Sequence, residues 1–197
     1  MLRPILIHPN PKLKKVCEPV LEIDDALIEL SDDMLETMYH APGIGLAAPQ
    51  IGVLNRIIVM DCEKDEADNR KPIVMINPEI VFSSDEESTY EEGCLSIPEQ
   101  FAEIKRPTSV QVRWVDTNGT EQEQEFHGLW STCVQHEIDH LDGILITDEI
   151  RKYTQTITKK KKYGRNERVM VKLSNGETEF MKYKKAEPLL LEGAEIL

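Results

Sequence analysis

Several features that mark special classes of protein are missing from this sequence. The 197 residues contain no apolar run approaching the ~18 residues that suggest a membrane span, so no membrane association is expected. The N-terminal segment, MLRPILIHPNPKL, has only a short apolar patch interrupted by prolines, unlike the hydrophobic region of a secretory signal peptide. Only four cysteines are present, at positions 17, 62, 94 and 133, and no two form a CxxC pair. A disulfide framework is therefore not expected, and a reducing cytoplasm is the predicted location.

Basic residues are scarce in most of the chain. Residues 1–150 contain 11 Lys and Arg against 30 Asp and Glu, a net charge of −19, whereas residues 151–197 contain 12 against 6, a net charge of +6. The overall charge of −13 argues against general nucleic-acid binding, and no sequence-specific recognition of nucleic acid is expected. Residues 151–172, however, include nine basic residues and a single acid, Glu167. We therefore expect the two regions to meet different partners.

The periodicity of the apolar residues predicts the main elements of the fold. Residues 24–40 and 129–141 carry apolar side chains at three- and four-residue intervals, which indicates two amphipathic helices, the first with Asp24 as its N-cap. Strands are predicted at residues 56–61, 73–82, 109–116 and 120–126, the last two joined by a turn at Asn118-Gly119. This order predicts an α+β fold in which antiparallel or mixed strands pack around a central helix.

The length of the chain favours one domain with an appendage. We place the main domain at residues 1–150 and a C-terminal extension at residues 151–197. In the extension, a basic helix is predicted to run from beyond Asp148 through residues 159–162. Residues 169–173 and 178–183 then form a predicted β-hairpin around Asn175-Gly176. Sequence does not decide whether the part beyond residue 164 is a small folded addition or a tail.

The second predicted helix contains the motif HExxH, as His136-Glu137-Ile138-Asp139-His140. Four residues advance a helix by about 400°, so the two imidazoles project from one face and can bind one metal ion. Glu137 lies beside them and can handle the proton of a metal-bound water. The alternative is a chance match on a helix surface, because HExxH alone is only moderately specific.

A catalytic zinc or iron site of this type needs a third protein ligand and an open position. Three residues are candidates: Cys94, Cys133 and His127. Cys94 follows Gly93, which lets the backbone come close, and a thiolate is a natural ligand. Cys133 lies on the same helix, where a buried hydrophobic role is more common, and His127 lies at a strand end, where surface exposure is more common. These considerations favour Cys94.

Three separated segments resemble the signature motifs of one enzyme family. They are GIGLAAPQ at residues 43–50, EGCLS at residues 92–96 and QHEIDHLDG at residues 135–143. All three are similar to the motifs of the bacterial-type peptide deformylases, and they occur in that family's order without a break. The resemblance extends over roughly residues 1–150, which we therefore interpret as a deformylase-like catalytic domain.

The resemblance implies a mononuclear metal site. By position, its ligands would be Cys94, His136 and His140, with one divalent ion per chain. The family's ion is usually Fe²⁺ in the cell, with Zn²⁺, Ni²⁺ or Co²⁺ able to substitute.

The resemblance also implies a substrate and catalytic roles. The enzyme would remove the formyl group from the formyl-methionine of newly synthesised polypeptides and release formate. Glu137 would act as general acid and base, and Gln50 with the backbone N–H of Leu95 would form the oxyanion site.

Further residues would bind the peptide. The backbone around Gly43, Ile44 and Gly45 would pair with the extended substrate as an added strand. Cys133, with Ile44, would line the pocket for methionine, and Gly93 would allow close approach beside Cys94.

Two other functions compete with this interpretation. A zinc peptidase shares the HExxH chemistry but usually takes its third ligand from a later His or Glu. A metal-stabilised binding module would use a closed site, which usually has four protein ligands. The intact 43–50 and 92–96 motifs favour a deformylase over both.

The C-terminal extension departs from the family pattern. Family chains commonly end in a helix soon after the HExxH region, and in some bacterial members that helix docks on the ribosome. Here about thirty residues with hairpin character follow the predicted basic helix. The basic 151–172 stretch could contact ribosomal RNA through phosphate, although a solvated charged surface is favoured by sequence alone.

Overall fold

The computed structural model describes residues 1–63, 70–148, 168–173, 175–182, 184–186, 189 and 195–196. The chain divides into two units, Met1–Ile150 and Arg151–Leu197, and each is described by itself. In the described part of the chain, no helix is both long and apolar enough to cross a membrane. The elements of the first unit are η1 (Pro11–Lys14), α1 (Asp25–His40), β1 (Gly45–Ala47), η2 (Ala48–Ile51), β2 (Ile57–Met60), β3 (Ile73–Ser83), β4 (Glu87–Cys94), β5 (Ile97–Pro107), β6 (Ser109–Val115), β7 (Glu121–His127) and α2 (Gly128–Leu141).

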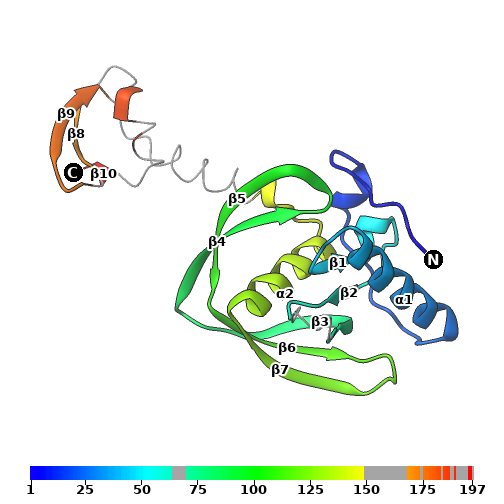
Figure 1. Ribbon diagram of the computed structural model, residues 1–197. Coiled ribbons are helices and arrows are strands. Elements are labelled where there is room, and N and C mark those ends of the chain that lie inside the picture. The colour runs from blue at the N-terminus through cyan, green and yellow to red at the C-terminus, as the bar shows by residue number, and fades with distance from the viewer. Residues whose placement is uncertain are drawn as a thin grey trace. The chain divides into compact units, whose positions relative to one another are not determined.

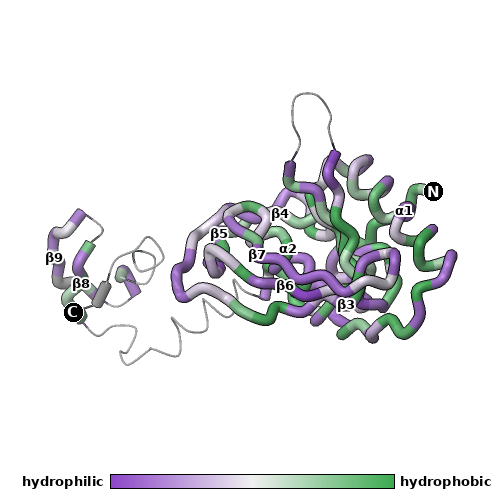
Figure 2. The backbone as a smooth tube through the Cα atoms, turned by 90° about the horizontal axis from the view of Figure 1, so that it is seen from below, coloured by the Kyte–Doolittle hydropathy of each residue, from purple (hydrophilic) through white to green (hydrophobic). Residues whose placement is uncertain are grey.

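The first unit is built on a five-stranded antiparallel sheet in the order β1-β2-β3-β6-β7. Strand β7 is hydrophilic along most of its length (Figure 2), and Phe126 is its one buried residue. The α+β class predicted from the sequence is confirmed, and the named strand pairs are all antiparallel. The four strands and two helices predicted for this unit are confirmed. None of their ends differs from the predicted position by more than one residue.

Strand β2, with the sequence IIVM, separates two hydrophobic clusters. Ile58 and Met60 belong to the cluster that includes the apolar residues of α2, whereas Ile57 and Val59 belong to the cluster that includes Met34 and Met38 of α1. Alternate side chains of a strand point to opposite faces, so a strand between two helices must be apolar throughout. Figure 1 shows β1 and β2 between the two helices.

Helix α1 begins where the sequence predicted. The Asp24 side chain accepts a hydrogen bond from the Leu27 backbone N–H at 2.8 Å, which satisfies one of the free donors of the first turn. The helix ends at His40, ahead of Pro42 and Gly43, and the chain then enters β1.

The two-stranded sheet β4-β5 continues the β3-β6 pair as one long ribbon. Ser83 pairs with Val110 in the first ladder and Glu87 pairs with Pro107 in the second. Between them, the Ser84 N–H donates to the Ser109 carbonyl at 3.0 Å. Helix α2 contacts β5 of the ribbon and β1, β2, β6 and β7 of the five-stranded sheet. In Figure 1, α2 accordingly lies between the β4-β5 hairpin and the strands of that sheet.

The β4-β5 hairpin was missed by sequence reasoning. Its strands are rich in glutamate and include Pro98, and burial alternates clearly only over Ala102, Ile104 and Arg106. The short strand β1 was also missed, because the apolar segment that contains it has no alternation. Both omissions matter, since these segments carry part of the candidate site.

The second unit contains an antiparallel sheet in the order β10-β8-β9, formed by β8 (Arg168–Lys172), β9 (Thr178–Lys182) and β10 (Glu195–Ile196). Its hydrophobic cluster includes Val169, Val171 and Met181. The predicted hairpin is therefore confirmed, while β10 was not predicted. The basic helix predicted from beyond Asp148 to residue 162 lies outside the described residues.

A glycine after α2 fixes how the N-terminal segment packs. Gly143 has a φ of +71°, and a Cβ there would lie 2.6 Å from the Lys14 carbonyl oxygen. The Cys17 N–H also donates to the Leu141 carbonyl at 2.8 Å, so this segment is bound to the end of α2.

We expect Gly143→Ala to destabilise the protein more than Gly119→Ala. Both glycines have positive φ, which costs an alanine about 1 kcal/mol, but a Cβ at Gly119 meets nothing within 4 Å. The overlap with backbone at Gly143 should add roughly 1–3 kcal/mol. Urea unfolding of both variants measures the difference, and equal losses would contradict the proposed packing.

Candidate active site

Three side chains that can bind metal converge where β4 meets α2. Cys94 is the last residue of β4, and His136 and His140 lie one turn apart on α2. One ligand atom from each lies within 4.8 Å of the others, and Cys94 Sγ is 3.2 Å from His140 Nε2. Their exposed fractions are 9%, 9% and 1%, so the cluster is almost closed to solvent.

The other two candidates for the third ligand lie elsewhere. Cys133 Sγ contacts the Ile44 carbonyl oxygen at 3.6 Å and is not a member of the cluster. His127 is exposed at the start of α2, where its Nε2 lies 3.7 Å from a carboxylate oxygen of Glu125. Of the three alternatives left by the sequence, only Cys94 is brought to the histidines.

His136 is held by a buried acid that sequence reasoning did not single out. Its Nδ1 lies 2.9 Å from Glu92 Oε2, which leaves Nε2 as the nitrogen available to a metal. Glu92 also pairs with Arg106 through Nε–Oε1 at 2.6 Å and Nη2–Oε2 at 3.0 Å, and Arg106 Nη1 lies 2.8 Å from Asp139 Oδ2. Glu92 could have been suspected from its place in the EGCLS segment, whereas nothing in the sequence marks Arg106.

Burial and hydrogen bonding oppose one another in setting the pKa values of these groups. Burial opposes the charge of Glu92, but hydrogen bonds with His136 and Arg106 outweigh it and lower the pKa. Burial also opposes the charge of His136, but hydrogen bonds with Cys94 and Glu92 raise its pKa to about 10. Burial, followed by the charge of His136, holds the pKa of His140 well below its usual value.

Glu137 lies beside the cluster with an unsatisfied oxygen. Its side chain is buried, and Oε2 is one of two buried side-chain polar atoms without a hydrogen-bond partner in the described structure; the other is His140 Nδ1. Burial raises the pKa of Glu137 to about 7. A group that titrates near neutral pH can both accept and donate a proton.

Gly45 makes room for this carboxylate. A Cβ at Gly45 would lie 2.3 Å from Glu137 Oε1 and 2.8 Å from Cys133 Sγ. At Gly43 a Cβ would instead meet the end of the Leu95 side chain at 2.8 Å, and that end can move.

Gln50 approaches the cluster from η2. Its Oε1 accepts a hydrogen bond from the Ala47 N–H at 2.8 Å, and its Nε2 lies 3.7 Å from Cys94 Sγ and 3.2 Å from Ser96 Oγ. The bond from Ala47 fixes the amide so that its donor group points toward the cluster.

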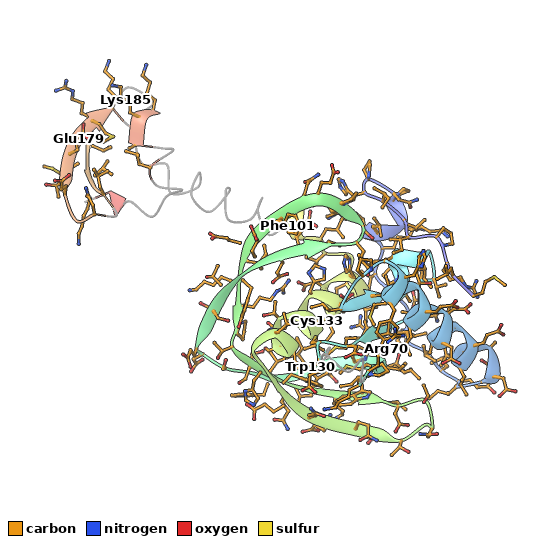
Figure 3. All side chains as sticks on the ribbon, viewed as in Figure 1. Arg70, Phe101, Trp130, Cys133, Glu179 and Lys185 are labelled. Carbon is orange, nitrogen blue, oxygen red and sulfur yellow. The ribbon has the colours of Figure 1, made fainter. Side chains whose placement is uncertain are left out.

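A cavity of about 430 Å³ opens onto these residues. Figure 3 shows Cys133 on α2 and Phe101 on β5, two of its lining residues. The cavity brings together all the predicted substrate-binding and oxyanion positions, which line it: Gly43, Ile44, Gly45, Gln50, Gly93, Leu95 and Cys133.

The donor set fits a divalent transition-metal ion. One thiol and two imidazoles are ligands that both zinc and iron accept. Within residues 1–63 and 70–148, no fourth His, Cys, Asp or Glu joins the group. The orientation of His136 by Glu92 is the kind of support that metal-binding histidines usually receive.

Known proteins of one family match the same part of the chain. The family model described as "Polypeptide deformylase" matches residues 2–156. A peptide deformylase of Rhizobium meliloti (strain 1021) is 54% identical over 151 residues, covering 77% of this chain and 86% of that protein. The crystal structure of peptide deformylase from Thermotoga maritima has a TM-score of 0.71 at 42% identity and covers 76% of this chain and 97% of that one. A Met-Ala-Ser-bound crystal structure of class I type b peptide deformylase from Acinetobacter baumannii has a TM-score of 0.71 at 33% identity, covering 76% and 98%.

We expect Cys94→Ala to abolish tight metal binding and Cys133→Ala to preserve it. Both cysteines line the cavity, but only Cys94 lies with the histidines. Titration with Co²⁺ should give one ion per chain and a thiolate absorption band in the wild type and in Cys133→Ala. The band should be lost in Cys94→Ala; its loss in Cys133→Ala instead would reverse the assignment.

Proposed function

The chain belongs to the polypeptide deformylase family, and we propose that residues 1–150 carry out that family's reaction at the Cys94, His136 and His140 cluster. The family implies removal of the formyl group from the N-terminus of formyl-methionyl nascent peptides. The observation that carries the proposal is the juxtaposition, in one cavity, of a three-ligand cluster and a buried carboxylate with an unsatisfied oxygen. A closed structural metal site would need no such carboxylate.

The enzyme family is metal-dependent, and the three side chains would hold the ion. We propose Fe²⁺, with Zn²⁺, Ni²⁺ or Co²⁺ able to substitute. When bound, the ion would lower the pKa of a coordinated water so that a nucleophile is available at neutral pH. We propose a central position for α2 in the fold. This position would place both histidines against β4, where Cys94 can complete the set of ligands.

Glu137 would move the protons of the reaction. Its carboxylate would accept a proton from the attacking water and deliver it to the amine nitrogen as the C–N bond breaks. The products are formate and a peptide with a free N-terminal amine. The burial that brings the pKa of Glu137 to about 7 supports both steps, because neither protonation state is strongly disfavoured.

Gln50 and Leu95 would stabilise the negative charge that develops on the formyl oxygen. The Gln50 amide is already fixed by Ala47 and directed toward the cluster, so it needs little rearrangement. Leu95 follows Cys94 directly, and its backbone N–H would be the second donor. A preorganised donor of this type is typically worth about 3 kcal/mol of the barrier.

The peptide would bind in an extended form along β1. This strand lies at the edge of the five-stranded sheet, so one side of its backbone is not paired within that sheet. The substrate would pair there with Gly43, Ile44 and Gly45. Gly93 would border it from β4, and Cys133 would contact the methionine side chain. The Met-Ala-Ser peptide bound to the Acinetobacter relative supports a peptide of this kind as ligand.

Ribosome contact through residues 151–172 is a separate proposal. Its support is the charge of this stretch, with nine basic residues and one acid. Such a contact would weaken as salt is added, because it depends on phosphate neutralisation.

The proposed function predicts release of formate from formyl-Met-Ala-Ser by the iron-loaded protein under anaerobic conditions. Glu137→Gln should lower the rate at least about 100-fold while one metal ion per chain is retained, because it removes only the proton-transfer group. Glu103→Gln, on the exposed side of β5, is the matched control and should keep the wild-type rate. Cleavage of unformylated peptides without formate release would indicate a peptidase instead.

We expect Gly45→Ala to be far more harmful than Gly43→Ala. The new methyl group at Gly45 overlaps the Glu137 carboxylate, and displacement of a catalytic group by about 1 Å can cost roughly 100-fold in rate. At Gly43 the end of Leu95 can rotate away, so the loss should stay below about tenfold. Steady-state formate release compares the two variants. Wild-type kinetics for Gly45→Ala would refute this account of the cavity.

A further inference from the structure

One buried arginine connects the elements that carry the proposed metal ligands. Arg106 lies on β5, and its side chain is 9% exposed. It makes three short contacts with two carboxylates: Nε and Nη2 with Glu92 of β4, and Nη1 with Asp139 of α2. Cys94 ends β4 and the histidines lie on α2, so Arg106 joins both ligand-bearing elements.

The first connection fixes the orientation of the Glu92 carboxylate. Two parallel N–H···O contacts hold the plane of that carboxylate in line with the guanidinium. In this orientation, Oε2 is directed at His136 Nδ1, at 2.9 Å. A carboxylate that accepts from Nδ1–H selects the ring tautomer whose lone pair is on Nε2.

The second connection acts on the turn of α2 between the two histidines. Asp139 directly precedes His140, and its contact with Arg106 Nη1 at 2.8 Å fastens this turn to β5. The distance between the two imidazoles along α2 is set by the helix, but their distance from Cys94 depends on how α2 sits against the ribbon.

We propose that Arg106 is a positioning residue for the metal site, acting through Glu92 on the His136 ring and through Asp139 on the α2 turn that bears both histidines. This inference rests on the metal site of the proposed function, but not on its reaction. If Arg106 had only a structural role, its replacement would leave metal binding unchanged. Stability alone does not test the proposal, because a buried ion pair can often be replaced by apolar side chains without loss of stability.

The experiment compares Arg106→Met with Arg113→Met. Arg113 is an exposed arginine of β6 whose Nε contacts Glu123 of β7 at 3.0 Å, so its removal breaks an ion pair that involves neither β4, β5 nor α2. Co²⁺ affinity is measured by competition with a chromophoric chelator, together with the visible spectrum of the Co²⁺ form and the urea unfolding of the metal-free protein.

We expect Arg106→Met to weaken Co²⁺ binding about 10–100-fold and to alter the spectrum, because support of a metal ligand is worth that much. Arg113→Met should change neither. Unchanged affinity and spectrum in Arg106→Met would overturn the proposal, whatever the variant does to unfolding. Failure of the wild type to bind Co²⁺ would overturn it as well.

Two milder variants keep the test valid if Arg106→Met does not fold. Arg106→Lys retains the charge but cannot form the paired contact with Glu92, and Asp139→Asn removes only the charge of the second partner. Each should weaken Co²⁺ binding by less than Arg106→Met. Wild-type affinity in both would overturn the proposal. Because affinity is read without formate, absence of formate release would count against the proposed function and not against this inference.

Discussion

The catalytic unit depends on satisfying the polar face of a buried helix. Helix α2 buries Ser131, Gln135, His136, Glu137 and His140. A buried polar group without a partner costs roughly 1–3 kcal/mol, so this face requires donors and acceptors from outside the helix. Most of them come from the β4-β5 ribbon: the Pro107 carbonyl accepts from Ser131 and Gln135, and the Glu92 carboxylate pairs with His136.

Two atoms of this face are left without partners, and both belong to the proposed site. Glu137 Oε2 and His140 Nδ1 are buried and unpaired in the described structure. Buried polar atoms of this kind are usually explained by a functional role or by a bound water or ion. Gly45 also lowers the stability of the fold, because glycine loses more conformational freedom on folding than any other residue. The space it leaves is occupied by the Glu137 carboxylate and the Cys133 thiol.

Sequence reasoning succeeded where the information is local. The cap at Asp24, the spacing of HExxH and the turn at Asn118-Gly119 each depend on residues a few positions apart. The hairpin β4-β5 was missed because its many glutamates hide the alternation of buried and exposed residues, and because the helix that β5 contacts, α2, lies some distance along the chain. Arg106 was missed for the same reason: an arginine on a strand is usually exposed, and only the approach of Glu92 and Asp139 makes its burial tolerable. Cys94 was favoured over Cys133 from local residue chemistry alone, and the structure brings Cys94 to the two histidines.

The described part of the second unit has a hydrophobic cluster against one side of β8. Four buried residues, Val169, Val171, Met181 and Ala186, form the centre of its hydrophobic cluster, and Arg168, Met170 and Lys172 lie on the opposite side of β8. The family model ends at residue 156, before β8, so the family's chemistry says nothing about this sheet. Its net charge of +6 contrasts with −19 for residues 1–150. An anionic surface would therefore attract the second unit and repel the first. Attraction of this kind raises local concentration without altering the chemistry of a site, so the proposed ribosome contact would act on encounter with nascent chains rather than on catalysis.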